Sequence, residues 1–235
     1  MVVEFYSMLF SKKHYFSNLK HHTMKKLLLS ALFGFAGMLM ASAQSFEGVI
    51  EFKKQTLTDT VNYVYYIKGD KVRLDEIGNK SKKVEGSFII DLKSNSMLSL
   101  SHERKMYIEQ TSGTPAAMTG KPEVKKTDNV KTMQGTKCME YIVKNTDEKT
   151  QVTYWMGSGN YSFFFKLLKV LNRKDKSAIY VQQLTGIDGM FPFLSVQQNL
   201  ETGKDEVRME VTKLQKKAVD AGQFEVPKDY QKFQK

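Results

Sequence analysis

The stretch Phe46-Glu47-Gly48-Val49-Ile50-Glu51-Phe52-Lys53 decides the expected fold of this chain. Phe46, Ile50 and Phe52 fall on one set of alternate positions, and the other set carries the charged residues Glu47, Glu51 and Lys53. A period of two is typical of an antiparallel strand that is buried on one face only. The stretch therefore predicts a strand that lies against a core on one side and faces water on the other.

The same alternation recurs along most of the chain, and short turns such as Gly69-Asp70 and Thr202-Gly203 separate the stretches. Closely spaced strands predict a meander rather than alternating strands and helices. We expect a mainly β (α+β) fold, a curved antiparallel sheet or incomplete β-barrel of roughly ten strands wrapped around one apolar helix. The further predicted strands are residues 61–68, 71–77, 86–91, 97–101, 106–110, 137–144, 152–156, 194–200 and 207–214.

One strong helix is predicted at residues 160–173, with Asn160 or Ser162 as its N-cap. Its polar face consists only of Lys166, Lys169 and Arg173, and nearly all its other positions are apolar. Such a helix must be buried over most of its circumference or must cover a ligand. Packing into the concave side of the sheet is the interpretation we favour.

Residues 111–128 have a different composition, with glycines, prolines and charged residues but no alternation. The segment predicts a long loop, and loops of this length are uncommon without a role. It either gates a site or is disordered, and the composition favours disorder.

The N-terminal region contains the pattern of a secretory signal peptide, residues 24–43. Lys25 and Lys26 precede an apolar run that ends in Ala41-Ser42-Ala43, which fits a signal peptidase site. Glycines interrupt the run, and it is short for a membrane anchor, the alternative interpretation. We expect cleavage near Ala43 and a periplasmic or secreted single domain, residues 44–235, without a transmembrane segment. Residues 1–23 are expected to be a non-native N-terminal extension.

The charge pattern argues against a nucleic-acid partner. The net charge is +11, but lysines alternate with acids along most of the chain, which is typical of a solvated surface. Cys138 is the single cysteine, so an intramolecular disulfide is excluded, and no cysteine follows the signal for lipid attachment. Cys138 lies in a predicted strand, and we interpret it as a buried core residue rather than a redox thiol.

Motifs for catalysis, metal binding or cofactor binding are not found in the sequence. His102 is the only histidine of residues 44–235, and Gly157-Ser158-Gly159 lacks the spacing of a nucleophile elbow. We therefore expect no enzymatic activity, no catalytic residue, no metal and no cofactor.

The chain is instead rich in aromatic residues, which suit either a filled core or a cavity for an acyl chain. Periodicity alone does not distinguish the two. The candidate ligand-binding residues are Tyr63, Tyr65, Trp155, Phe163, Phe164, Leu167 and Leu168.

Several stretches resemble an exported bacterial family known only as domain of unknown function 4412. They are Phe46-Glu47-Gly48-Val49-Ile50, Gly135-Thr136-Lys137-Cys138-Met139-Glu140-Tyr141, Tyr154-Trp155-Met156 and Phe224-Glu225-Val226-Pro227. The family is similar in outline to the lipoprotein carriers of the LolA and LolB type. That resemblance implies an incomplete antiparallel β-barrel closed by helices over an apolar cavity. The gating arginine of the carriers does not map onto one residue of this chain.

Two functions follow as hypotheses. The first is a non-enzymatic exported protein that binds a lipid, acyl chain or other hydrophobic ligand in the cell envelope. The alternative is a structural or interaction protein with a filled barrel that contacts another envelope protein. The identity of the ligand or partner and the oligomeric state stay open.

Overall fold

The structure is a computed structural model that describes residues 45–110 and 117–234. The predicted extension, residues 1–23, and the predicted signal peptide, residues 24–43, lie outside the described residues. The described residues form one compact unit. In the described part of the chain, none of the helices has the length and apolar character needed to cross a membrane.

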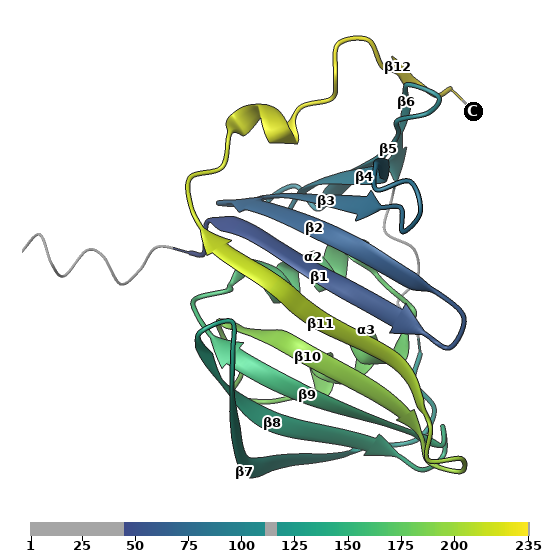
Figure 1. Cartoon of the computed structure of the whole chain (residues 1–235), viewed down its shortest axis with the longest axis vertical. Helices are drawn as coiled ribbons and strands as arrows, with labels where there is room; N and C mark the ends of the chain where they lie inside the picture. The colour runs from purple at the N-terminus through teal and green to yellow at the C-terminus, as the bar shows by residue number, and fades with distance from the viewer. Residues whose placement is uncertain (1–44, 111–116, 235) are drawn as a thin grey trace, which may run out of the picture. The chain divides into compact units, whose positions relative to one another are not determined.

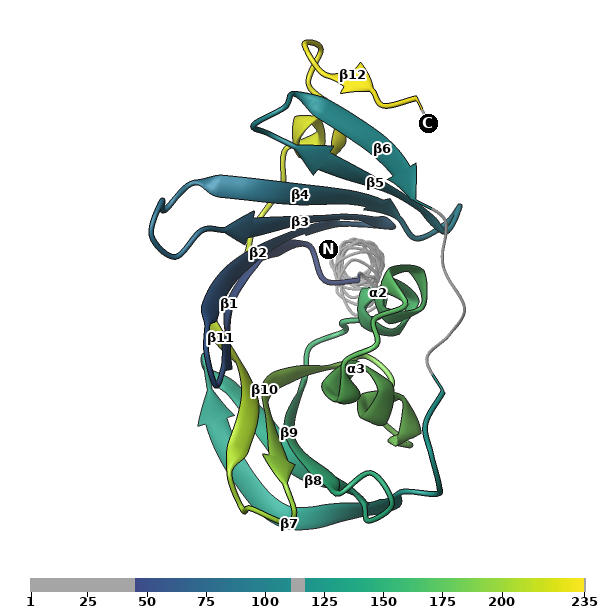
Figure 2. The same ribbon diagram turned by 90° about the vertical axis from the view of Figure 1, so that its right-hand side faces the viewer.

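The described residues form a single sheet of twelve strands in the order β12-β6-β5-β4-β3-β2-β1-β11-β10-β9-β8-β7. Neighbouring strands are antiparallel except β12 and β6, which are parallel. The sheet is open and strongly curved (Figures 1 and 2), as predicted. The strands are β1 (Gly48–Thr56), β2 (Thr60–Lys68), β3 (Lys71–Ile77), β4 (Val84–Asp91), β5 (Ser96–Ser101), β6 (Met106–Gln110), β7 (Glu123–Met133), β8 (Thr136–Asn145), β9 (Thr150–Ser158), β10 (Met190–Asn199), β11 (Asp205–Lys216) and β12 (Gln231–Lys232).

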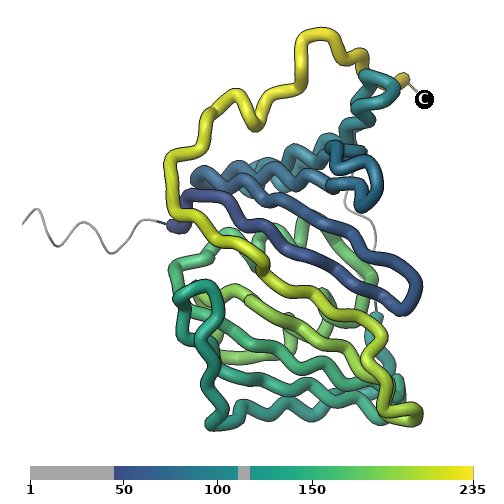
Figure 3. The backbone as a smooth tube through the Cα atoms, in the orientation of Figure 1, coloured from purple at the N-terminus to yellow at the C-terminus, as the bar shows by residue number. Residues whose placement is uncertain are grey.

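Apart from β12, the sheet consists of two meanders, β1–β6 and β7–β11, that meet at one antiparallel pair. Gly48 of β1 lies opposite Lys216 of β11, so the first strand of one meander pairs with the last strand of the other in the middle of the sheet (Figure 3). Alternation places the core on the concave face, as on β2, where Tyr63, Tyr65 and Ile67 are buried. The decisive stretch of the sequence thus forms a central strand.

Helix α2 (Phe163–Leu171) lies in the concavity of the sheet (Figure 2), as predicted, but it is shorter than residues 160–173. Ser162 occupies the N-cap without a side-chain cap hydrogen bond. Asn172 ends the helix in the left-handed conformation, with φ 43° and ψ 47°, and its N–H donates to the Leu168 carbonyl. Five of the seven hydrophobic residues of α2 are buried and the other two are partly buried, which agrees with the thin polar face of the sequence.

A second short helix, α3 (Lys176–Tyr180), also lies on the concave side and continues into the 3-10 turn η2 (Val181–Gln183). The sequence predicted one helix at residues 160–173, so α3 is an additional helix that lies after this range. Asp175 caps α3 by accepting a hydrogen bond from the Ala178 N–H, 3.2 Å away.

The predicted loop at residues 111–128 is corrected in its second half, because residues 123–128 belong to the edge strand β7. Nearly all of β7 is exposed, so its sequence lacks the alternation by which a half-buried strand is found. Between Lys126 and Val130 its pairing with β8 is irregular, and Thr127 and Asn129 both donate to the Glu140 carboxylate. Residues 111–116 lie outside the described residues.

The C-terminal segment, residues 217–234, crosses the outer face of β1–β6 (Figure 1). It contains the 3-10 turn η3 (Ala221–Phe224) and the short strand β12, which pairs with the edge of β6. Lys68 Nζ donates to the Val219 carbonyl at 2.7 Å, and Tyr230 contacts His102. The segment gives β1–β6 a buried outer layer that includes Val49, Leu100 and Val219.

Candidate ligand-binding cavity

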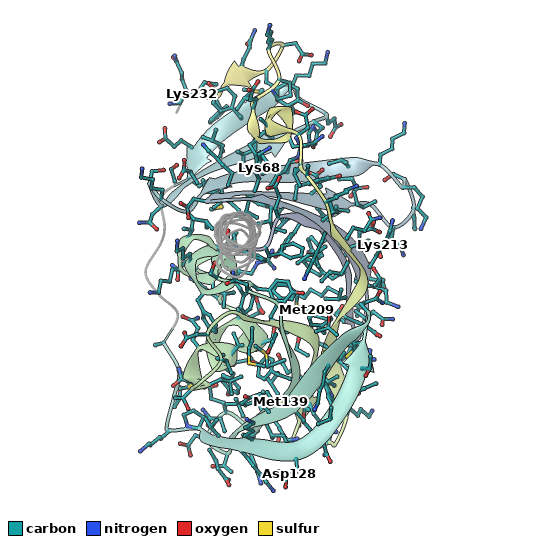
Figure 4. The ribbon with its side chains drawn as sticks, turned by 90° about the vertical axis from the view of Figure 1, so that its left-hand side faces the viewer. Lys68, Asp128, Met139, Met209, Lys213 and Lys232 are labelled. Atoms are coloured by element: carbon teal, nitrogen blue, oxygen red, sulfur yellow. The ribbon has the colours of Figure 1, made fainter. Side chains whose placement is uncertain are left out.

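An apolar cavity of about 70 Å³ lies between the concave face of the sheet and the helices α2 and α3. Phe52 and Tyr65 line it from the sheet, Phe164 and Leu167 from α2, and Ala178 from α3. In Figure 4 the labelled Met209, a further lining residue, lies between the sheet and the helices, whereas Lys213 lies on the outer side. The cavity is therefore the space that remains where two helices meet a strongly curved sheet.

The two tyrosines of the cavity wall, Tyr65 and Tyr154, are neutral groups. Tyr154 is fully buried and donates from its hydroxyl to the Ser177 carbonyl at 2.7 Å, which fixes the start of α3 on β9. Burial raises the pKa of Tyr154 well above its usual value. Burial likewise raises the pKa of Tyr65 to about 12. Both phenols stay protonated at physiological pH, so the part of the wall that they form is uncharged.

An aromatic cluster fills the concavity beside the cavity. The Tyr161 ring lies 5.0 Å from Phe46 and 5.5 Å from Phe191, and Phe163 lies 5.9 Å from Phe191. Phe164 lies 5.0 Å from Phe191 in an edge-to-face arrangement. Phe164 and Phe191 line the cavity as well, so they mark the boundary between packed core and open space.

Four of the seven candidate ligand-binding residues line this cavity, namely Tyr65, Phe164, Leu167 and Leu168. Tyr63 lies beside it, with its ring 5.1 Å from Phe52. Phe163 belongs to the aromatic cluster. Trp155 follows the inward-facing Tyr154 on β9, so it belongs to the opposite face of the sheet, where Lys131 lies 5.8 Å from its ring. The binding role of all seven stays a prediction.

The sequence interpretation missed several lining residues, including Phe52, Phe191 and Arg173. The alternation around Phe52 was a sufficient signal for an inward orientation, whereas Phe191 lies in the continuous apolar run of residues 190–194, which gives no alternation. Arg173 gave no such signal, because a cation after a helix is ordinarily explained by the helix dipole. Its guanidinium instead lies 5.9 Å from the centre of the Tyr63 ring. Burial alone would lower the pKa of Arg173, but Tyr65, Asp175 and Tyr63 raise it above its usual value.

A second cavity of about 240 Å³ adjoins the first between α2 and the α3–η2 pair. It shares Leu168 and Arg173 with the apolar cavity, and its other lining residues are mostly polar: Lys169, Asn172, Ile179, Gln182 and Gln183. The two cavities thus differ in character on either side of one arginine.

The groups that resemble a catalytic pair lie elsewhere. Ser87 Oγ lies 2.7 Å from His102 Nε2 on the outer face of β4, but it also donates to Asp75 at 2.5 Å and is buried. Arg73 pairs with Asp75 at 2.6 Å, and the C-terminal segment covers this network. Among the described residues, no group of three or more His, Cys, Asp or Glu side chains is placed to hold a metal ion.

The fold and the cavity define a class of protein in which an open, curved β-sheet closes around short helices. The chain belongs to the DUF4412 family, described as a domain of unknown function, which matches residues 46–230. The family predicted from the sequence is therefore confirmed. A comparison with curated proteins found no match.

Several solved structures are similar to this chain. An uncharacterized conserved protein from Thermus thermophilus has a TM-score of 0.50 at 9% identity, covering 80% of this chain and 90% of that one. MucB of Pseudomonas aeruginosa, solved with MucA, has a TM-score of 0.40 at 12% identity, covering 79% and 56%. A LolA superfamily protein from Nitrosomonas europaea has a TM-score of 0.34 at 8% identity, covering 78% and 91%.

Proposed function

We propose that this chain is a non-enzymatic exported protein that binds a lipid or another hydrophobic ligand in the cell envelope. The observation that carries the proposal is the cavity between the sheet and α2–α3, which is lined mainly by aromatic and aliphatic side chains, with Arg173, Asp175 and Glu210 as its charged residues. Largely apolar, concave sites with a few convergent polar groups are the usual form of small-molecule sites.

The cavity is so small that a ligand must separate the helices from the sheet in order to enter. About 70 Å³ is less than the roughly 300 Å³ of the smallest usual ligand pockets. The contacts that must yield on the α2 side are mainly apolar, and the ion pair of Lys166 with Asp70 is exposed. Exposed pairs contribute little to stability, so α2 is the element that we expect to move.

The test uses the exported protein purified from cell envelopes and the neutral fluorescent probe N-phenyl-1-naphthylamine. A binding protein should carry acyl chains that mass spectrometry detects after extraction. The delipidated protein should then bind the probe with a saturable rise in fluorescence. If no lipid co-purifies and the probe does not bind, the proposal is wrong.

The alternative, an interaction protein with a filled interior, has its own supporting observation. The edge strand β7 exposes Val124 and Val130, at 42% and 51%, beside backbone groups that a partner strand can pair with. This function would be favoured if the purified protein carries no lipid and does not bind the probe, but captures one envelope protein through β7.

The export part of the proposal rests on the signal-peptide pattern at residues 24–43. Intact-mass measurement of envelope-extracted protein should give a chain that begins at Gln44. A mature chain that retains residues 24–43 would contradict it.

A further inference from the structure

Arg173 lies at the junction of the two cavities. It lines the apolar cavity together with Phe52 and Tyr65, and it lines the polar cavity together with Lys169. It directly follows Asn172, whose left-handed conformation ends α2 and redirects the chain toward α3. The guanidinium is therefore held where the two helices meet, and not on a freely moving surface side chain.

The charge of Arg173 has no ion-pair partner among the described residues. Its guanidinium contacts the Tyr63 ring, at 5.9 Å from the ring centre. Asp175 lies near, but its carboxylate already accepts from Ser177 Oγ at 2.7 Å and from the Ala178 N–H at 3.2 Å. Asp175 and Glu210 also line the apolar cavity beside Arg173, but neither forms an ion pair with it. A partly buried guanidinium that forms no ion pair is a site at which an incoming anion gains more than it would in water.

The polar cavity has the lining that an anion requires. Two of its seven lining residues are cations, Lys169 and Arg173, and none of the seven is a carboxylate. Gln182 and Gln183 add amide groups on the opposite wall, and Gln182 is fixed by donating to the Ala178 carbonyl at 2.8 Å. Guanidinium, ammonium and amide donors are the groups that bind carboxylates and phosphates in proteins.

We propose that the hydrophobic ligand is a single-chain amphiphile with an anionic head group. Its chain enters the apolar cavity between α2 and the sheet, and its head group binds Arg173 and Lys169 in the polar cavity. This inference rests on the proposed function and adds the charge and the shape of the ligand. Leu168 and Arg173, which both cavities share, lie where the chain meets the head group.

The experiment compares two ligands of equal chain length, laurate and dodecanol, by displacement of N-phenyl-1-naphthylamine from the delipidated full protein. The wild type should bind laurate about tenfold more tightly than dodecanol, as one favourable charge pair of about 1.4 kcal/mol gives. In Arg173→Gln this preference should fall to about twofold or less, with dodecanol affinity unchanged. The matched control is Lys174→Gln, which removes the adjacent exposed cation and should keep the preference.

The outcomes separate this inference from the function on which it rests. Equal binding of laurate and dodecanol by the wild type would overturn the anionic head group and leave the hydrophobic-ligand function standing. Equal loss of both ligands in Arg173→Gln would assign Arg173 a structural role and also overturn it. Failure of the probe and of both ligands to bind the wild type would overturn the proposed function itself. Unchanged circular dichroism of Arg173→Gln is the check that the variant is folded.

Discussion

Phe164 borders the cavity on one side and the aromatic cluster on the other. Its ring contacts Phe165 and Phe191, at 5.2 Å and 5.0 Å, while the cavity leaves part of its surface without neighbours. Truncating the Phe164 side chain should therefore lower the free energy of unfolding less than truncating a phenylalanine in a filled core. We expect Phe164→Ala to lower the free energy of unfolding in urea by about 2 kcal/mol, below the roughly 3–5 kcal/mol of a packed phenylalanine.

Phe193 provides the matched comparison, because it is fully buried within the same aromatic cluster and does not line the cavity. Phe193→Ala should cost the full 3–5 kcal/mol or so. Equal costs at the two positions would mean that Phe164 is packed as tightly as Phe193, and would favour the filled-interior alternative.

Cys138 is fully buried on β8, as expected, opposite Gly157 of β9. Burial raises the pKa of its thiol to about 11. The reactive thiolate is scarce at neutral pH and the sulfur is shielded, so a maleimide reagent should label native protein at about pH 7 only very slowly. Labelling should become fast in denaturant. Rapid labelling of native protein would contradict this expectation and point to a redox role.

At the scale of elements, the sequence identified the strands whose faces differ in polarity and the one helix with a long apolar face. The sequence did not reveal the elements that have neither a difference in polarity between two faces nor a long apolar face. β7 is exposed on most positions because it lies at the edge of the described sheet, and α3 is only five residues long, too short for a helical period. The position of α3 depends on tertiary contacts that sequence spacing does not reveal.

Glu148, at the turn between β8 and β9, makes the main polar attachment of α3 to the sheet. Its carboxylate pairs with Lys176 at 2.6 Å, accepts a hydrogen bond from the Tyr180 hydroxyl and accepts another from the Thr119 N–H at 2.9 Å. Burial alone would raise the pKa of Glu148, but Lys176 and Tyr180 hold it below its usual value. The side chain is ionised and only 8% exposed.

We expect Glu148→Gln to destabilise the fold by about 1–3 kcal/mol, because two charge-assisted hydrogen bonds become weaker and Lys176 loses its partner. Glu201→Gln is the control, since its pair with Lys149 is exposed on both sides and should contribute about 0.5 kcal/mol or less. Both values come from urea unfolding at neutral pH. A Glu148 effect no larger than that of Glu201 would show that apolar packing alone holds α3.

At the scale of the whole molecule, the C-terminal segment is linked to the N-terminal meander through His102. The imidazole contacts Tyr230 Oη at 2.6 Å and Ser87 Oγ at 2.7 Å. Partial burial lowers the pKa of His102, and the positive charge of Arg73 lowers it further, while Asp75 acts in the opposite direction. The folded state thus favours the neutral ring.

A histidine whose pKa is lowered by folding binds protons more readily in the unfolded chain, so stability rises with pH in its titration range. The contribution of neutral His102 to the free energy of unfolding should be complete above the usual histidine pKa of 6.5 and should be lost as the pH falls below it. Unfolding free energies measured between about pH 7.5 and about pH 5, on either side of the histidine pKa, should decrease more in the wild type than in His102→Gln. Parallel pH profiles would show that folding does not lower the pKa of His102 and would contradict this expectation.

The curved sheet could be predicted from the sequence because alternation and turns recur over almost the whole described chain, and the family could be predicted because particular stretches such as Tyr154-Trp155-Met156 resemble it. The cavity could not be predicted. Phe163 and Phe164 are neighbours of the same type, yet one lies in the packed cluster and the other borders open space. Likewise, the place of Arg173 between two cavities depends on how α2 and α3 meet, which no local pattern encodes.

The single pairing of β1 with β11 also constrains the order in which the molecule can assemble. Each meander pairs strands that follow one another closely, so either can form early from local contacts. The seam between them closes only after residues 205–216 are present, because in the described sheet β11 is the strand that pairs with that edge of β1. A chain that emerges from its N-terminus onward therefore holds β1 with an unpaired edge for most of its synthesis. Such an edge is a site for aggregation, so this topology requires late closure of the seam and protection of β1 until then.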